Sequence, residues 1–457
     1  MAPMPLNDSM FLLAERREQP MHVGGLQLFH FPPDAGEDYL LELYQQVIHS
    51  DDVAPIFRRR PYRPATSLGA WSWQEDPDVD LEHHIRHSAL PRPGRVRELL
   101  ALASRLHGTL LDRHRPLWEA HLIEGLEGNR FAVYSKIHHS LMDGVSALRL
   151  LAQTLSPDPE TRDMPMPWST QPGRRQQPSS KGLAGLLDIP VSAARTSLEI
   201  AGLGPIAGKA AVKALLDSNS HLPSLAPKTI LNQPITGARR FAAQSWPLER
   251  VKAVASATGT TINDVVLAMC SHALRGYLLD LDALPADPLV AMTPVSLRQA
   301  GSEVGGNAVG ALLCNLATDV EDPAERLAAV HRSMEDGKSS LRSMTPTQVT
   351  VTSAVAMSPM ILGMLPGVRR LANPGYNLVI SNIPGPTEPL YWNGARLEGV
   401  YPMSIPTDGQ ALNITVTSYN GNLEFGLTGC RGTVPHLQRL LTHLDDGLAF
   451  LEKVTAP

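Results

Sequence analysis

The stretch that decides the fold of this chain is KIHHSLMDGVSALRLL, Lys136 to Leu151. It follows a β-favouring run at 131–137 and passes into a helical pattern, so it predicts a turn between a strand and a helix. The turn holds two histidines, a carboxylate and a glycine. Neutral imidazole is the side chain best suited to accept a proton near neutral pH. The pattern therefore predicts that a histidine of this turn projects into a cleft and can act as a general base.

The other residues of the turn have different expected roles. In an extended segment the side chain of His138 points away from that of His139, so we expect it to pack or to position its neighbour. Asp143 can fix the imidazole or the loop, and Gly144 permits a backbone shape that other residues resist. The alternative for His139 is an ordinary buried histidine that satisfies its own hydrogen bonds.

Length and composition bound the class of protein. A single core stops growing near ~250 to 300 residues, so a chain of 457 residues predicts two domains with a cleft between them. The sequence is 43% hydrophobic and 19% charged, which excludes disorder for most of it. The formal net charge is -5, and lysines and arginines are spread along the chain, so nucleic acid is not an expected partner.

The texture of the sequence predicts three segments. Residues 1–160 are expected to form an α/β or α+β domain that carries the histidine turn, and residues 240–457 a second domain of strands and helices. Residues 161–239 are rich in proline, glycine and serine and predict a linker or crossover with helices at 182–216. The expected strands are 22–31, 131–137, 240–246, 289–295, 307–317, 376–381 and a hairpin at 411–428. The expected helices are 37–49, 96–112, 248–258, 262–279 and 435–454.

Location and metal binding are predicted from absent signals. Three isolated cysteines fit a reducing compartment. The first residues do not match a signal peptide, and no run reaches about 18 apolar residues. We expect a cytoplasmic protein, with contact at the inner membrane or lipid inclusions left open. His83, His84 and His87 have a spacing that could suggest zinc, but no companion ligand stands out, so we expect no metal.

Several motifs together resemble one family. His138, His139, Asp143 and Gly144 spell HHxxxDG, which resembles the signature of coenzyme A-dependent acyltransferases and peptide-synthetase condensation domains. Further segments match, in order, the pattern of bacterial wax ester synthase/diacylglycerol acyltransferases, so the resemblance spans nearly the whole chain. These segments are PMHVGG (20–25), PLWE (116–119), ND (263–264), PVSLR (294–298) and SNIPGP (381–386).

The resemblance implies a fold and a reaction. The fold is α/β, with two pseudo-symmetric chloramphenicol-acetyltransferase-like domains and a tunnel between them. His139 would take the proton from an acceptor hydroxyl, which attacks the thioester of long-chain acyl-coenzyme A and expels the thiolate. The acceptor is a fatty alcohol or diacylglycerol. Acyl-coenzyme A is a substrate, and no cofactor is implied.

The resemblance also assigns roles to single residues. Arg298 is the expected ionic partner of Asp143, because comparable acyltransferases pair this aspartate with an arginine. The oxyanion donors stay open, with the amide of Gly144 and the side chain of Asn263 as candidates. We expect architectural roles, including a core anchor and helix capping, for Pro116, Leu117, Trp118, Asn263 and Asp264.

Two alternatives remain beside this reading. The first is a condensation-type acyltransferase with a carrier-protein donor, against which stand the PLWE and SNIPGP contexts and the absence of a carrier domain in the sequence. The second is a catalytically silent lipid-droplet binding protein, in which His139 has no role. The apolar, methionine-rich stretch 349–365 fits either an ordinary buried helix pair or the lining of an acyl or alcohol channel.

Overall fold

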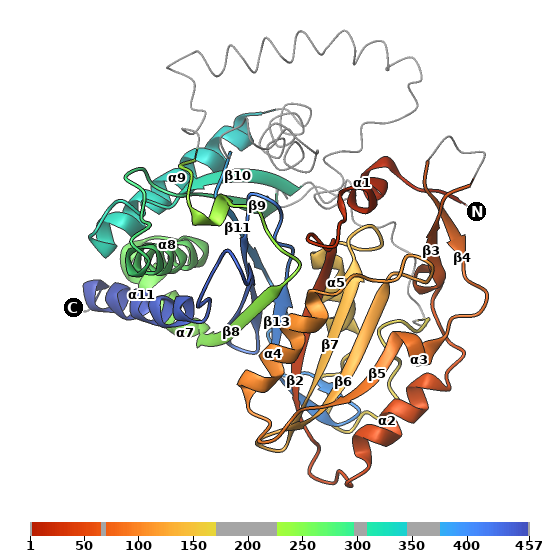
Figure 1. Cartoon of the computed structure of the whole chain (residues 1–457). Helices are drawn as coiled ribbons and strands as arrows, with labels where there is room; N and C mark the ends of the chain where they lie inside the picture. The colour runs from red at the N-terminus through yellow and green to blue at the C-terminus, as the bar shows by residue number, and fades with distance from the viewer. Residues whose placement is uncertain (1, 65–69, 171–225, 297–308, 345–374, 456–457) are drawn as a thin grey trace.

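Two six-stranded sheets lie side by side in the computed structural model, and helices flank both (Figure 1). The structure describes residues 2–64, 70–170, 226–296, 309–344 and 375–455. A small third sheet near the N-terminus has the strand order β1-β4-β3. Its strands are β1 (Ala2–Pro3), β3 (Arg59–Tyr62) and β4 (Ser72–Glu75).

The first large sheet has the strand order β12-β13-β2-β7-β6-β5. Its strands are β2 (His22–His30), β5 (Ile85–Ala89), β6 (Trp118–Leu126), β7 (Arg130–His138), β12 (Tyr391–Trp392) and β13 (Ala395–Met403). The helices of this half are α1 (Leu6–Ala14), α2 (Tyr39–Ile48), η1 (Pro55–Arg58), α3 (Leu81–His84), α4 (Val96–His107) and α5 (Gly144–Gln153). Apolar residues on both faces of the sheet form two clusters of the core.

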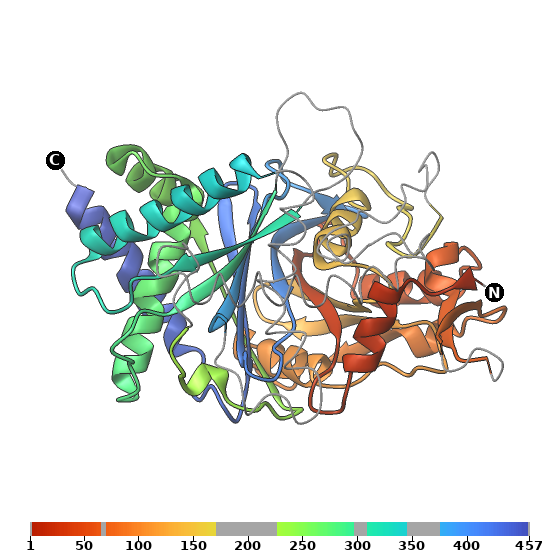
Figure 2. The same ribbon diagram turned by 90° about the horizontal axis from the view of Figure 1, so that it is seen from above.

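The second large sheet has the order β10-β9-β11-β14-β15-β8, and its helices cover the face away from the first sheet (Figures 1 and 2). Its strands are β8 (Arg239–Pro247), β9 (Val290–Ser296), β10 (Val309–Asn315), β11 (Leu378–Ile383), β14 (Leu412–Tyr419) and β15 (Asn422–Cys430). The helices are η3 (Ile230–Asn232), α7 (Leu248–Thr258), α8 (Ile262–Asp280), α9 (Pro323–Ser343) and α11 (Arg439–Thr455). The central helix α8 buries most of its length in the core of this half.

Four strands of each sheet repeat one arrangement. In the first sheet, β2, β7 and β6 are antiparallel neighbours and β5 lies parallel to β6; β8, β15, β14 and β11 follow the same order and directions in the second. The registers of the two sheets agree as well. The first residue of β2, His22, pairs with the last residue of β7, His138, and the first residue of β8, Arg239, pairs with the last residue of β15, Cys430. The predicted α/β fold with pseudo-symmetric halves is therefore confirmed.

Strand β13 joins the two halves. It comes late in the chain, yet it pairs antiparallel with β2 of the first sheet and packs against β15 of the second. The contact is close, since a Cβ on Gly426 would lie 1.9 Å from the carbonyl oxygen of Pro402. The domain boundary at residue 240 stays a prediction, and the first sheet contains two strands from beyond it, β12 and β13.

Most of the predicted elements are present where the local pattern placed them. Thr261 caps α8 in a reciprocal capping box with Asp264. The hairpin turns at Asn420 and Gly421, whose φ angles are 43° and 80°, the left-handed conformation that an Asn-Gly turn requires. The helix predicted over 96–112 ends earlier, at His107. The helices predicted at 182–216 lie outside the described residues.

Within the described ranges, no single helix has the length and apolar character needed to cross a membrane. Helices α7 and α8 meet that test only as a pair, by length and composition, and they are bent by 103° relative to each other.

Candidate active site

The histidine turn lies between β7 and α5, as the sequence predicts. Strand β7 ends at His138 and helix α5 begins at Gly144. Asp143 is the N-cap of α5, because its Oδ1 accepts a hydrogen bond of 2.7 Å from the amide of Ser146. The amide of Gly144 is one of the four at the start of the helix that lack an intrahelical acceptor, at the positive end of the helix dipole.

His139 is held by an aromatic contact. Its ring stacks on Phe11 of α1, with 4.2 Å between the centroids and 20° between the planes. Its Nδ1 is buried and has no hydrogen-bond partner among the described residues, while the side chain as a whole keeps some exposure. Burial lowers the pKa of His139 below the ordinary 6.5, helped by His138 and opposed by the carboxylate of Asp143. The ring is therefore neutral at neutral pH, which is the form that accepts a proton.

His138 is fully buried and turned toward a different set of groups. Its Nδ1 accepts hydrogen bonds from the amide and the hydroxyl of Ser140, at 3.1 and 2.6 Å. The proton therefore lies on Nε2, which is 3.4 Å from Oε1 of Glu15. The geometry fits the positioning role expected for this residue.

Glu15 follows α1 directly and was not among the residues singled out from the sequence. Arg113 donates two hydrogen bonds to its carboxylate, at 3.1 and 3.0 Å, and the amide of Met21 donates a third. Burial alone would raise the pKa of Glu15, but His138, the Met21 amide and Arg113 together lower it. Phe11 of α1 and Glu15 directly after it thus contact one histidine each. The sequence signal was weak, because these residues lie more than a hundred positions before the turn.

The PLW residues have architectural contacts. Trp118 is buried, its indole nitrogen donates to the carbonyl of Phe57 at 2.9 Å, and its ring stacks between His84 and Trp168. The carbonyl of Leu117 accepts a hydrogen bond of 3.0 Å from the amide of His138. Leu117 therefore ties the start of β6 directly to the histidine turn, and Pro116 immediately precedes it.

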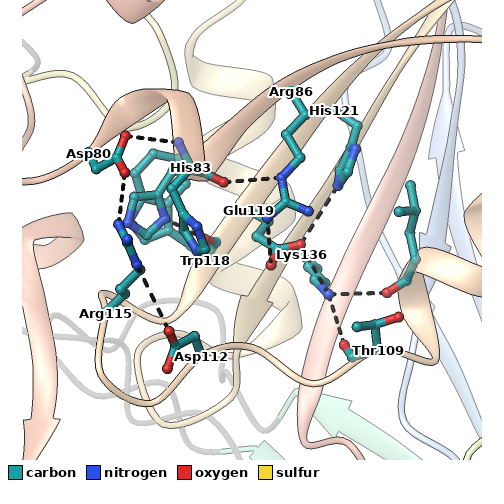
Figure 3. A network of polar contacts seen from close by, with 12 residues as sticks. Asp80, His83, Arg86, Thr109, Asp112, Arg115, Trp118, Glu119, His121 and Lys136 are labelled. Carbon is teal, nitrogen blue, oxygen red and sulfur yellow. Dashed lines mark hydrogen bonds and ion pairs between the residues drawn. The ribbon is translucent and has the colours of Figure 1, made fainter.

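A buried ionic network supports the same strands (Figure 3). Lys136 lies two residues before His138, and its Nζ is 3.2 Å from Oε2 of Glu119 on β6. The same ammonium donates to two carbonyls at the end of α4, at 3.1 and 2.8 Å. Burial would raise the pKa of Glu119, but His121, Lys136 and Arg86 lower it to about 2. A lysine inside the apolar run FAVYSKI was the sequence signal that could have found this network.

Asn263 and Asp264 lie in the first turn of α8. Asp264 completes the capping box and also accepts from Nδ1 of His331 at 2.8 Å. Oδ1 of Asn263 lies 3.5 Å from the donating Nδ2 of Asn382 in the SNIPGP segment. In the described part of the chain no hydrogen bond or ion pair joins Asn263 to the histidine turn, so its role as an oxyanion donor stays a prediction.

The remaining predicted residues lie elsewhere. Arg298 and the stretch 349–365 are outside the described residues, so the Asp143–Arg298 pair stays a prediction. Nδ1 of His84 lies 2.8 Å from the carbonyl oxygen of Trp118. Nε2 of His87 lies 3.2 Å from Oε2 of Glu124. Among the residues with described positions, no group of three or more histidine, cysteine or acidic side chains could hold a metal ion.

Two adjoining cavities lie beside α5. The first is narrow, about 40 Å³, and lies on the face of the first sheet that presents Ser135 and Ile137. The second, about 370 Å³, lies between α5 and residues 383–386 of the second half. Gln27, Leu151 and Leu155 line both, and the other lining residues are mostly apolar. The second cavity lies where the predicted tunnel was expected, between the halves.

His139 lies next to this passage without lining it. Its amide donates to the carbonyl of Met21 at 2.8 Å, which extends the pairing of β2 and β7 by one residue. Alternate side chains of a strand share a face, so His139 lies on the same side as Ser135 and Ile137. The equivalent position in the second half is Arg431, whose amide donates to Ala238. Only the first half therefore offers a histidine here.

The two-sheet fold defines the class of protein. It matches the first condensation domain of the calcium-dependent antibiotic synthetase, with a TM-score of 0.58 over 100% of this chain and 96% of that chain, at 17% identity. That likeness shows the fold alone, which is the two-sheet fold of condensation domains.

Closer comparisons specify the family. The wax ester synthase/diacylglycerol acyltransferase catalytic domain model matches residues 4–266, and the C-terminal domain model of that family matches residues 305–452. The chain therefore belongs to the wax ester synthase/diacylglycerol acyltransferase family, and it is an O-acyltransferase.

Individual relatives agree over almost their whole length. The wax ester synthase/diacylglycerol acyltransferase from Marinobacter aquaeolei VT8 superimposes with a TM-score of 0.81, at 44% identity over 100% of both chains. O-acyltransferase WSD of Acinetobacter baylyi is 44% identical over 100% of this chain and 98% of its own. A Mycobacterium tuberculosis protein named as a probable diacylglycerol O-acyltransferase is 50% identical over 98% of both.

Proposed function

We propose that this protein transfers a long-chain fatty acyl group from acyl-coenzyme A to the hydroxyl of a fatty alcohol or diacylglycerol, with His139 as general base. The observation that carries the proposal is the state of His139. Its ring is neutral, stacked on Phe11, and lies on the side of β7 that faces an apolar cavity. Membership of the family supports the choice of substrates.

The proposed reaction needs one proton transfer in each direction. Because Nδ1 of His139 is buried, we assign Nε2 as the atom that takes the proton from the acceptor hydroxyl. The oxygen then attacks the thioester carbon, and the tetrahedral intermediate collapses with loss of the C–S bond. The thiolate leaves and regains a proton from the imidazolium. No enzyme-bound acyl group and no cofactor take part.

The start of α5 would stabilise the charge that develops on the carbonyl oxygen. Gly144 contributes an amide without an intrahelical acceptor, at the positive end of the helix and five residues after His139. The predicted ion pair between Asp143 and Arg298 would hold this turn in place. The amide of Gly144 is thus the first candidate for the oxyanion donor.

The substrates set the expected surroundings of the protein. The two cavities are lined mainly by apolar side chains, which suits a hydrocarbon chain. Long-chain alcohols and diacylglycerol partition into lipid, so a cytoplasmic enzyme would meet them at the membrane or at lipid inclusions. Peripheral contact with such a surface is part of the proposal.

The test compares wild type with His139→Ala, using palmitoyl-coenzyme A with hexadecanol, with diacylglycerol and without acceptor. Loss of a general base should lower thiol release by ~10²- to 10⁴-fold. His83→Ala serves as the control, because His83 is a partly exposed histidine of α3. Unchanged ester formation in His139→Ala would overturn the proposed mechanism.

Two further measurements separate the alternatives. A donor acylated on a carrier protein, used in place of palmitoyl-coenzyme A, tests the condensation-type reaction. Flotation of both variants with liposomes tests the lipid-binding alternative, which predicts equal binding and no ester formed by wild type.

A further inference from the structure

Gln27 is a polar residue in the wall of both cavities. It lies on β2, is 4% exposed, and pairs with Val133 on one side and Val400 on the other. It lines both cavities, at the place where they adjoin, together with Leu151 of α5 and Leu155 just after that helix. An amide at this position has mostly apolar neighbours.

The side chain of Gln27 has no hydrogen-bond partner among the described residues, although its backbone belongs to the sheet. Two other polar groups in the same wall are satisfied internally. Thr154 donates to the carbonyl of Leu151 at 2.8 Å, and Glu119 is paired with Lys136. A buried amide without a partner is unfavourable unless something in the cavity bonds to it. The amide of Gln27 can therefore hydrogen-bond to whatever occupies the passage, water or substrate.

The position of Gln27 relative to His139 indicates which part of a substrate reaches it. His139 continues the pairing opposite Met21, so Gln27 lies six residues further along β2. At roughly 3.3 Å per residue the separation is about 20 Å. An extended chain covers about 1.2 Å per bond, since three backbone bonds span roughly 3.5 Å. Gln27 would thus face a substrate chain about 16 bonds from the reacting atoms.

We propose that Gln27 determines which length of aliphatic chain the enzyme accepts, because its polar amide lies beside the far end of the chain that binds along α5. This inference rests on the proposed function. A chain that ends before Gln27 leaves its amide hydrated. A longer unsubstituted chain must displace the water bound to the amide and cannot replace its hydrogen bonds. A chain with a hydroxyl at its end would satisfy the amide instead.

The experiment measures kcat/KM for a series of saturated acyl-coenzyme A donors with a fixed short acceptor, and for a series of alcohols with a fixed donor. The kcat/KM of wild type should fall once the chain extends beyond Gln27. Gln27→Leu should raise kcat/KM for these longer chains by roughly 5- to 100-fold, which is the effect of one unpaired amide. The series that responds identifies whether donor or acceptor occupies the cavity.

With an ω-hydroxy chain of the same length, the expected order of activity between wild type and Gln27→Leu is reversed. Wild type should accept it better than Gln27→Leu does, because only the amide can bond to the hydroxyl. Gln244→Leu is the matched control, since it makes the same change at an exposed glutamine of β8 that lines neither cavity. Gln27→Asn keeps the amide and should keep the preference for the hydroxyl, which holds the test open if the leucine variant folds poorly.

The outcomes are distinct. Identical chain-length profiles for wild type and Gln27→Leu in both series would overturn the inference and leave the acyltransferase reaction intact. A wild-type protein that acylates no acceptor in either series would overturn the proposed function itself.

Discussion

Phe11 lies flat against His139, so the N-terminal helix forms one wall of the proposed active site. The helix ends beside Glu15, which approaches His138. One short element therefore holds both histidines of the turn, the first through a carboxylate and the second through an aromatic face. Arg113 fixes the end of that helix by donating to the carbonyl of Leu12 at 2.8 Å.

The stack predicts that Phe11→Ala lowers kcat by about 10-fold or more with little change in KM, because the imidazole loses its fixed orientation. Phe11→Tyr, which keeps the ring, should retain most of the activity. Steady-state kinetics with palmitoyl-coenzyme A and hexadecanol measure both. Leu13→Ala, an exposed position on the same helix, is the control. An equal loss when Phe11→Ala is added to His139→Ala would show that Phe11 does not act through the histidine.

The pKa of His139 predicts the acid limb of the pH–rate profile. The base must be unprotonated, and burial lowers its pKa, so kcat/KM should fall only below pH 6.5. The carboxylate of Asp143 opposes this lowering, so Asp143→Asn should move the limb to still lower pH. Asparagine also caps helices, which keeps α5 in place. Profiles from pH 4.5 to 8 test this, and a limb that moves upward in Asp143→Asn contradicts it.

The Lys136–Glu119 pair predicts a large loss of stability on removal of one partner. Lys136→Met leaves a buried carboxylate without its ammonium and should lower the free energy of unfolding by about 3 kcal/mol. The double variant Glu119→Gln/Lys136→Met removes both charges and should lose less. Urea unfolding of the three proteins gives the comparison, and equal losses in the single and double variants would argue against a buried charge effect.

Glu424 predicts a pH-dependent stability where β15 meets β13. Burial raises its pKa from 4.5 to about 7, and it accepts a hydrogen bond from Ser245, which contacts Tyr401 of β13 at 2.9 Å. Between these pH values the folded state holds a proton that the unfolded state has lost. Stability should therefore fall as pH rises from 4.5 to 7, by at most about 1.4 kcal/mol per pH unit.

Glu424→Gln isolates that contribution, because the amide does not titrate. The difference in unfolding midpoint between the variant and wild type should grow in favour of the variant from pH 5 to pH 7 and level off above. Parallel midpoints across this range would show that the carboxyl group does not change its charge there.

Local patterns predicted much of the fold and part of the site. The strand, turn and helix around His139, the capping box of Thr261 and the Asn420-Gly421 hairpin each depend on residues a few positions apart. Contacts between distant parts of the chain were not predictable in this way. Helix α1 as a wall of the site and β13 in the first sheet both depend on pairing across a hundred residues or more.

The network around Lys136 was missed for a related reason. A single lysine in an apolar strand gives no indication of its partner, and Glu119 belongs to a motif that was interpreted through its tryptophan. The resemblance to a family, and not the local sequence patterns, predicted that two similar sheets lie next to each other beside the histidine turn. The roles of Asn263 and Arg298 stay predictions.

The late strand β13 has a consequence for biosynthesis. Until residue 403 has left the ribosome, β2 lacks its outer neighbour, and the nascent first half carries an open sheet edge with unpaired amides and carbonyls. A gene fragment that stops before residue 391 should therefore yield an aggregation-prone product, and the halves of this enzyme should mature together rather than one after the other.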